Sequence, residues 1–238
     1  MLMTTSVVPG ASSAAASNPF LAPAAHPRRL VLTAVATVLV LVAVGFLLRL
    51  VPLDVGLSRV VHRSHLGALG AIAEGFYRAV KPVSAAGIMV VATAVVGFAT
   101  RRWQAALAFV GTIALTWGSA EAIKLVVERP RPGLSEQVVN AVGTTADPSF
   151  PSGHVAFVAA FAAALICVSW ATRWRALAIG VGVVLVAAMM LSVVYIGVHY
   201  VGDAVASVIW VAGIFPAVRA LLAFVVARAQ EVVDARRR

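Results

Sequence analysis

Long apolar runs alternate along the chain with short segments that carry arginine, proline or aspartate. The first run, 30–51, contains one charged residue, Arg49, near its end. A helix of this length reaches about 33 Å at a rise of 1.5 Å per residue, enough to cross the hydrocarbon core of a bilayer. Further runs of spanning length follow at 83–100, 103–127, 153–172, 176–198 and 204–227. The pattern predicts an all-α polytopic membrane bundle of about six transmembrane helices.

The segment between the first two runs, 52–82, mixes apolar with ionisable residues. This composition is typical of one or two helices that lie in the membrane interface, where they would cover a lateral entrance for lipid. His62 and His65 stand three residues apart in this segment, but no carboxylate or cysteine at ligand spacing accompanies them. A solvated helix is the favoured interpretation, and we expect no metal or cofactor site.

Composition places the chain in a membrane, because 61% of its residues are hydrophobic and 12% are charged, against about 45–50% and 25% in soluble domains. The net charge of +10 does not indicate a nucleic-acid partner, since the basic residues flank the apolar runs. Arginines gather in alternate connections, at 28–29, 101–102, 173–175 and 228–238. The positive-inside rule places these connections and both termini in the cytoplasm of a cell-membrane protein.

Three parts are expected along the chain. Residues 1–27 are rich in alanine, serine and proline, and we interpret them as a disordered cytoplasmic tail. Residues 28–228 form the membrane domain, and residues 229–238 form a basic cytoplasmic tail. The connection 128–152, which lies between two runs and contains four prolines, is expected on the non-cytoplasmic side.

Ionisable residues near the end of the third run need an explanation, because charges inside a membrane are costly. Lys124 is followed after seven residues by Arg131, and the next connection ends in the sequence 151–154, Pro-Ser-Gly-His. Two runs later stands His199, with Asp203 four residues on. The two connections are separated by two crossings, so they open on the same membrane face. These groups can therefore meet in one site.

Their chemistry suits a phosphate ester. Lys124 and Arg131 can bind phosphate oxygens, and the backbone N–H groups of 152–154 at a helix start can bind an anion. Glycine at 153 would let the backbone approach the ligand closely. An imidazole held by a carboxylate, as His199 would be by Asp203, is a candidate nucleophile. The second imidazole, His154, could then protonate the leaving oxygen.

Together the three motifs, Lys124-x6-Arg131-Pro132, Pro151-Ser152-Gly153-His154 and Ser192-x6-His199-x3-Asp203, resemble the signature of the type 2 phosphatidic acid phosphatase superfamily. The resemblance implies a metal-independent membrane phosphatase that acts on a lipid phosphate. It also implies a phosphohistidine intermediate at His199 and a leaving-group acid at His154. Substrates in the bacterial branch include polyprenyl diphosphates, phosphatidylglycerol phosphate and phosphatidic acid.

One position departs from this signature. The third motif of the family begins Ser-Arg, whereas here Ser192 is followed by Val193. We expect Arg129, two residues before Arg131, to replace the missing phosphate-binding guanidinium. Two alternatives to hydrolysis stay open: transfer of the phosphoryl group to an acceptor other than water, and non-catalytic binding or transport of a lipid phosphate.

Overall fold

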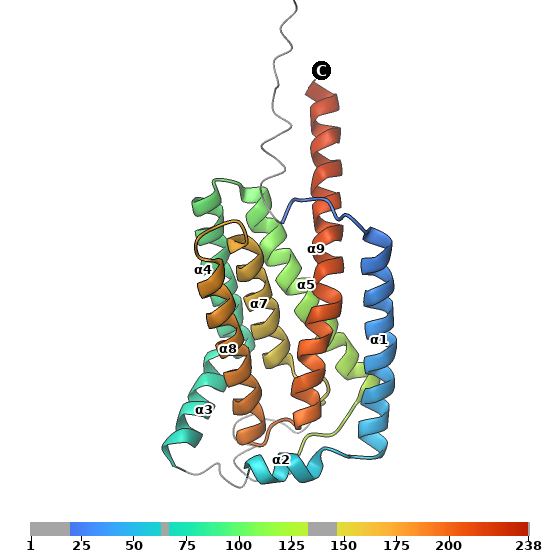
Figure 1. Ribbon diagram of the computed structural model, residues 1–238, viewed down its shortest axis with the longest axis vertical. Coiled ribbons are helices and arrows are strands. Elements are labelled where there is room, and N and C mark those ends of the chain that lie inside the picture. The colour runs from blue at the N-terminus through green and yellow to red at the C-terminus, as the bar shows by residue number, and fades with distance from the viewer. Residues whose placement is uncertain (1–19, 63–66, 133–146, 238) are drawn as a thin grey trace, which may run out of the picture.

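The computed structural model describes residues 20–62, 67–132 and 147–237, which form an all-helical bundle (Figure 1). The helices of this described part are α1 (Pro27–Leu50), α2 (Val55–His62), α3 (Ala68–Ala79), α4 (Pro82–Thr100), α5 (Trp103–Val127), α7 (Gly153–Ser169), α8 (Arg175–Tyr195) and α9 (Val201–Arg237). None of the described residues lies in a strand. The predicted all-α fold is confirmed.

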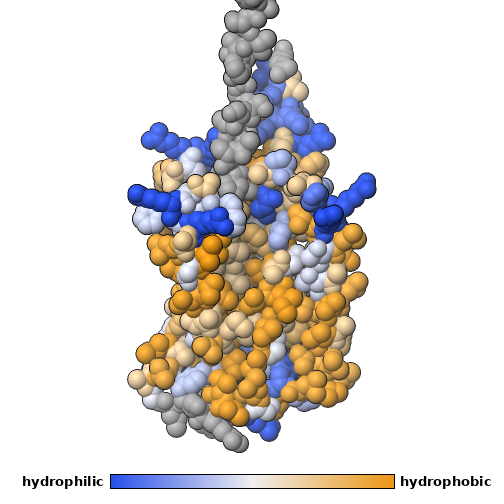
Figure 2. Space-filling model, viewed as in Figure 1, coloured by the Kyte–Doolittle hydropathy of each residue, from blue (hydrophilic) through white to orange (hydrophobic). Residues whose placement is uncertain are grey.

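Five of the described helices, α1, α4, α5, α8 and α9, are long and apolar enough to cross a membrane. The sixth apolar helix, α7, has 17 residues, which corresponds to about 26 Å. It packs against α5, α8 and α9, and most of its alanines are buried. Apolar side chains cover most of the visible face of the bundle (Figure 2). The chain is therefore a multi-pass membrane protein, while six crossings remain a prediction.

The bundle has two distinct ends. Helix α1 begins and α9 ends toward the same end, where the α4–α5 and α7–α8 connections also lie (Figure 1). These two connections contain Arg101, Arg102 and Arg173. The chain enters α7 and passes from α8 to α9 at the opposite end. Helices α2 and α3 also lie at that opposite end, in the segment predicted to contain one or two interfacial helices. The expectation that the motif-bearing connections share one end is confirmed.

The predicted disordered tail, 1–27, needs correction for residues 20–26. Phe20 is fully buried and packs edge-to-face on Phe109 and Phe215, with ring centroids 5.7 and 6.5 Å away. Arg219 donates a hydrogen bond of 2.9 Å to the carbonyl oxygen of Ala22. An aromatic side chain covered by α5 and α9 holds this segment on the bundle. Residues 1–19 lie outside the described part of the chain.

The C-terminal end also differs from the expected boundary. The sequence pattern ended the last span at 227, but α9 continues without a break to Arg237. An ion pair between Arg228 and Glu231, 2.9 Å long and three residues apart, lies on this extension. Such pairs stabilise a helix outside the apolar zone. The basic segment predicted as a tail is thus helical as far as residue 237.

Candidate active site

His199 lies in the short connection between α8 and α9, and its side chain is buried. Its Nδ1 is 2.8 Å from the carbonyl oxygen of Ser149, which can only accept a hydrogen bond. Nδ1 therefore carries the proton, and Nε2 presents a lone pair. A guanidinium N–H of Arg131, 3.3 Å away, faces this Nε2. The ring is held in the tautomer that a nucleophilic Nε2 requires.

The expected partner of His199 is arranged differently from the sequence prediction. Asp203 Oδ2 lies 3.6 Å from Nδ1, longer than a hydrogen bond. The same oxygen accepts the backbone N–H of Tyr200 at 2.9 Å. Ser149, which sequence reasoning missed, provides the direct acceptor, and Asp203 contributes negative charge beside the ring.

The backbone before His199 forms a tight turn. The carbonyl oxygen of Val193 accepts the N–H groups of both Val198 and His199, each at 3.1 Å. Gly197 has a φ of +77°, a conformation that glycine adopts without strain. A Cβ atom at that position would also lie 2.7 Å from the ring of His62 on α2. Glycine is required here by both the turn and its neighbour.

Burial lowers the pKa of His199 well below its ordinary value of 6.5, and the positive charges of Arg131 and Lys124 lower it further. The hydrogen bond to Ser149 acts in the opposite direction but is outweighed. The imidazole is consequently uncharged at neutral pH, so Nε2 keeps a lone pair, which faces the Arg131 guanidinium.

Lys124 and Arg131 form the predicted pair of phosphate-binding cations, which we call the cradle. Both reach the carboxylate of Asp147: Lys124 Nζ lies 3.4 Å and Arg131 Nη2 lies 2.5 Å from it. Arg131 Nε also donates to the carbonyl oxygen of Asp147 at 2.8 Å. Glu121 is 2.9 Å from Lys124. Two carboxylates thus balance the two cations.

Asp147 remains ionised in this arrangement. Burial alone would raise the pKa of its carboxyl group, but the charges of Lys124 and Arg131 outweigh that effect and hold the pKa below its ordinary value of 3.8. With two acceptors on Asp147 and further bonds to the carbonyl oxygen of Val198 and to His199, most of the Arg131 donors are engaged. A substrate phosphate would have to replace Asp147 at this cation.

The start of α7 contributes to the same site, with two changes from the expectation. The backbone N–H of Ser152 donates to the carbonyl oxygen of Asp203 at 3.3 Å, so it is not free for an anion. The carboxylate of Glu121 fills the space that a side chain at position 153 would occupy. Lys124 Nζ lies 3.4 Å from the point where a Cβ atom of residue 153 would stand. Glycine at position 153 therefore lets the Glu121–Lys124 ion pair approach α7 closely. The sequence prediction had assigned this space to a ligand alone.

Two buried side-chain atoms at this helix start, Ser152 Oγ and His154 Nε2, have no hydrogen-bond partner among the described residues. Buried polar atoms without a partner are rare and call for an explanation. The imidazole of His154 stacks on the ring of Tyr77 from α3, with ring centroids 4.1 Å apart. This stacking fixes the ring plane while Nε2 stays without a partner.

Arg129 does not occupy the place predicted for it. Its side chain is 1% exposed and pairs with both Asp203, at 2.6 Å, and Asp54. The guanidinium also lies 4.0 Å from the ring centroid of Tyr200. Burial would lower the pKa of Arg129, but the hydrogen bonds and charges of the two aspartates raise it above its ordinary value. With its donors directed to carboxylates, Arg129 cannot replace the guanidinium that Val193 lacks.

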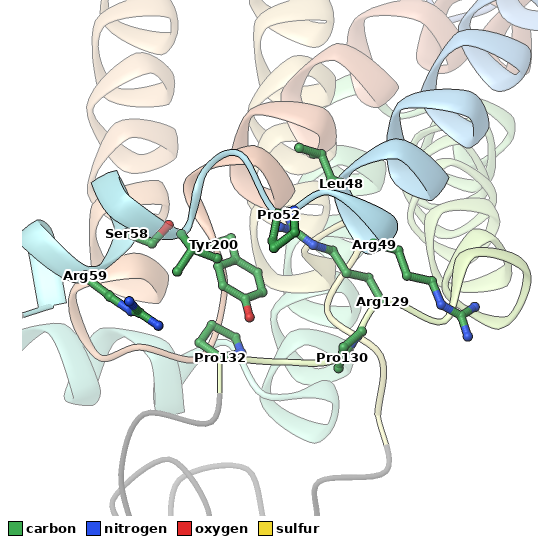
Figure 3. A pocket seen from close by; sticks show the side chains of 10 residues that line it. Leu48, Arg49, Pro52, Ser58, Arg59, Arg129, Pro130, Pro132 and Tyr200 are labelled. Atoms are coloured by element: carbon green, nitrogen blue, oxygen red, sulfur yellow. The ribbon is translucent and has the colours of Figure 1, made fainter.

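A cavity of about 320 Å³ lies beside the candidate site and is shown in Figure 3. Its lining includes Arg129, Pro130, Pro132 and Tyr200, but neither cation of the cradle nor either imidazole. Arg49 and Pro52 also line the cavity, and the guanidinium of Arg129 lies over the ring of Tyr200 (Figure 3). The cavity therefore borders the Arg129 pairs and is separate from the atoms that would contact phosphate.

The structure brings together His199, Asp203, Lys124, Arg131 and the start of α7, as the sequence spacing predicted. It adds the residues that sequence reasoning missed: Asp54, Tyr77, Asp147 and Ser149. Asp147 and Ser149 lie two to four residues before the Pro-Ser-Gly-His sequence. This closeness to a motif was the one signal in the sequence that could have indicated them. The positions 133–146 of that connection lie outside the described residues.

Comparisons with known proteins agree with this geometry. The family model described as "PAP2 superfamily" matches residues 105–226, just over half of the chain. A search of curated proteins finds no match. A solved structure described as the first transmembrane PAP2 type phosphatidylglycerolphosphate phosphatase, from Bacillus subtilis, has a similar fold with a TM-score of 0.61. The two chains are 20% identical, and the match covers 87% of this chain and 96% of that one. The family match, which includes all three motifs, shows that the chain belongs to the PAP2 superfamily.

Proposed function

We propose that this protein is a lipid phosphatase that removes a terminal phosphate from a polyprenyl diphosphate or a phospholipid phosphate through a phosphohistidine intermediate. The observation that carries the proposal is the environment of His199. A neutral imidazole, fixed with its proton on Nδ1, directs its Nε2 toward Arg131 of the cradle. Such an Nε2 is a nucleophile beside a site for anionic oxygens.

The partnerless atoms at the start of α7 support the same function. Ser152 Oγ can donate to a phosphate oxygen, and His154 Nε2 can donate to the oxygen of the leaving group. A phosphate held by Lys124 and Arg131 would satisfy both. The chain then supplies a nucleophile, an acid and charge stabilisation, which phosphoryl transfer requires.

The reaction would proceed in two displacements. In the first, His199 Nε2 forms a bond to phosphorus, the bond from phosphorus to the lipid oxygen breaks, and protonated His154 gives its proton to that oxygen. In the second, water attacks phosphorus and loses a proton to His154, and the P–N bond breaks to release inorganic phosphate. Negative charge from Asp203 stabilises the cationic phosphoimidazole between the two steps.

The proposed location of the site is the non-cytoplasmic face of the cell membrane. Support comes from the arginine-rich connections at the end of the bundle opposite to α2. An impermeant thiol reagent should label a cysteine introduced at position 135 in intact cells, in a Cys167→Ala background. Labelling only after cell lysis would reverse this orientation.

The function is tested by phosphate release from a panel of lipid phosphates, with purified protein in detergent and a chelator present. Wild type should release phosphate and His199→Ala should not. Val193 favours one alternative, because a site with fewer cations than the family signature could bind a lipid phosphate without turning it over. Binding of the panel lipids without release of phosphate would support that alternative.

A further inference from the structure

Helix α2, together with Asp54 just before it, contacts the turn that carries His199. His62 Nδ1 lies 3.0 Å from the carbonyl oxygen of Tyr195, before the turn. Four residues earlier, Ser58 Oγ accepts the backbone N–H of Val201 at 3.1 Å. Four residues earlier again, Asp54 Oδ2 accepts the backbone N–H of Gly202 at 2.9 Å. Residues four apart share a helix face. We call Asp54, Ser58 and His62 the brace.

The brace reaches the nucleophile through Arg129. The guanidinium of Arg129 joins Asp54 to Asp203, and the exposed fractions of the three side chains are 1%, 13% and 0%. The backbone of Arg129 has a second role, because its carbonyl oxygen accepts the N–H of Ser149 at 2.8 Å. Ser149 is the residue whose own carbonyl oxygen accepts from His199 Nδ1. One residue therefore holds both groups that face Nδ1.

We propose that Asp54, acting through Arg129, is a positioning residue for the phosphohistidine chemistry. Through Arg129, Asp54 holds Asp203 beside the His199 ring. It also keeps the backbone of Arg129 where its carbonyl oxygen accepts the N–H of Ser149, and it fixes the first turn of α9 through the N–H of Gly202. This inference rests on the proposed function. It makes the segment between α1 and α4, expected only to cover a lipid entrance, part of the apparatus that orients the nucleophile.

Charge accounts for the choice of residues. Arg129 alone beside Asp203 would cancel the negative charge that a cationic phosphoimidazole needs. With Asp54 added, two carboxylates and one guanidinium leave a net charge of −1 in a buried cluster next to His199. The planar fork of the Arg129 guanidinium contacts both oxygens of Asp54 and one oxygen of Asp203 at once, a geometry that the single nitrogen of lysine lacks. The cluster combines fixed geometry with negative charge.

The cradle is not part of this arrangement. Lys124 and Arg131 pair with Glu121 and Asp147, and neither contacts Asp54 in the described structure. Loss of Asp54 should consequently reduce the rate of phosphoryl transfer and leave substrate binding almost unchanged. A purely structural brace would instead change the amount of folded protein and leave kcat per folded molecule as it is.

The test uses purified full-length protein in detergent with a lipid phosphate as substrate. Asp54→Asn keeps the size of the side chain and one acceptor, and Asp54→Ala removes both acceptors. The cavity already borders Arg129, so we expect water to solvate the guanidinium in the alanine variant. Both variants should lower kcat about 10- to 100-fold, the scale of loss for a misplaced reacting group, with KM within about twofold.

Two further variants sharpen the assignment. Arg129→Lys should lose kcat to a similar extent, because lysine lacks the planar fork that contacts both oxygens of Asp54 while it reaches Asp203. The double variant Asp54→Ala/Arg129→Ala should be no worse than Arg129→Ala, since both residues act through one route. Arg49→Ala is the matched control: Arg49 binds the carbonyl oxygen of Val127 at 2.8 Å at the same end of the bundle but does not contact Asp203. Its kcat should equal that of wild type.

A second readout does not depend on turnover. The chain has five histidines, and the imidazole ¹⁵N signals of His199 can be assigned by comparison with His199→Gln. Wild type should show the single tautomer with the proton on Nδ1, and Asp54→Ala should show shifted or mixed signals. If wild type releases no phosphate, the proposed function fails, and this measurement still decides the positioning role. Unchanged kcat, or unchanged His199 signals in Asp54→Ala, would overturn the inference.

Discussion

Asp147→Asn offers a test in which a site variant should gain function. The carboxylate of Asp147 lies between Lys124 and Arg131, the position that a substrate phosphate would take. Asparagine keeps the shape of the side chain but removes its charge. The cradle would then carry a net positive charge before substrate arrives, because Glu121 alone would oppose the two cations.

The magnitude follows from the exposure of the pair. A hydrogen bond to a charged group contributes about 1.5–3 kcal/mol when it is buried. The Asp147 side chain is 47% exposed, so solvent screens its ion pairs and a value of about 1 kcal/mol is more appropriate. Removal of this competition should tighten substrate binding about fivefold. We expect KM to fall by that factor while kcat stays within about twofold.

The assay measures steady-state phosphate release and inhibition by inorganic phosphate, and both KM and the inhibition constant should decrease in Asp147→Asn. Glu74→Gln is the matched control, since it removes the same charge from an exposed ion pair with Arg78 on α3. An unchanged or increased KM in Asp147→Asn, with a lower kcat, would refute the reasoning. Asp147 would then take part in the reaction.

Three other predictions follow from the site. Val193→Arg should raise kcat/KM about 10-fold, because it returns a charge-assisted contact of about 1.5–3 kcal/mol to the cradle, and flat or lower kcat/KM in folded protein would contradict this. His154→Ala should lose turnover of lipid substrates but retain slow reaction with a nitrophenyl phosphate, whose leaving group needs little protonation, and equal loss on both would exclude the acid role. The pH profile should show no acid limb at pH 6.5: burial holds the pKa of folded His199 well below that value, so its neutral, nucleophilic form persists as pH falls past 6.5, whereas the stability linked to this lowered pKa is full above pH 6.5 and is lost progressively as pH falls from 6.5 to the folded pKa. Half-maximal kcat/KM near pH 6.5 would show that the His199 pKa is not lowered.

The sequence predicted the helices and the end of the bundle at which the motifs meet, because both depend on local signals. Apolar runs predicted the helix bounds to within a few residues except at the C-terminal end of α9, which extends ten residues past 227, and the number of crossings between the motifs placed them at one end. The lysine, arginine and histidine positions followed from motif spacing. Each of these conclusions needs only the order of residues along the chain.

Contacts between distant segments could not be predicted in this way. Arg129 appeared free in the sequence, yet it is enclosed by Asp54, 75 positions earlier, and Asp203, 74 positions later. Asp203 seemed the natural acceptor for His199 at helical spacing, but the chain turns at Gly197 and brings Ser149 closer. Phe20 likewise is held by rings from α5 and α9. The periodicity of apolar residues and the spacing of motifs carry no information on such contacts between distant segments.

The central claim is that His199 carries the phosphoryl group, and trapping that intermediate tests it most directly. Purified protein would be mixed with a lipid phosphate labelled at its terminal phosphate, in the presence of EDTA, and stopped in alkali to preserve phosphohistidine. The label should appear on the peptide that contains His199, should be absent from His199→Ala, and should form at a rate no slower than kcat. Phosphate release by His199→Ala at the wild-type rate, or wild-type activity that disappears in chelator and returns with a divalent metal, would contradict the account.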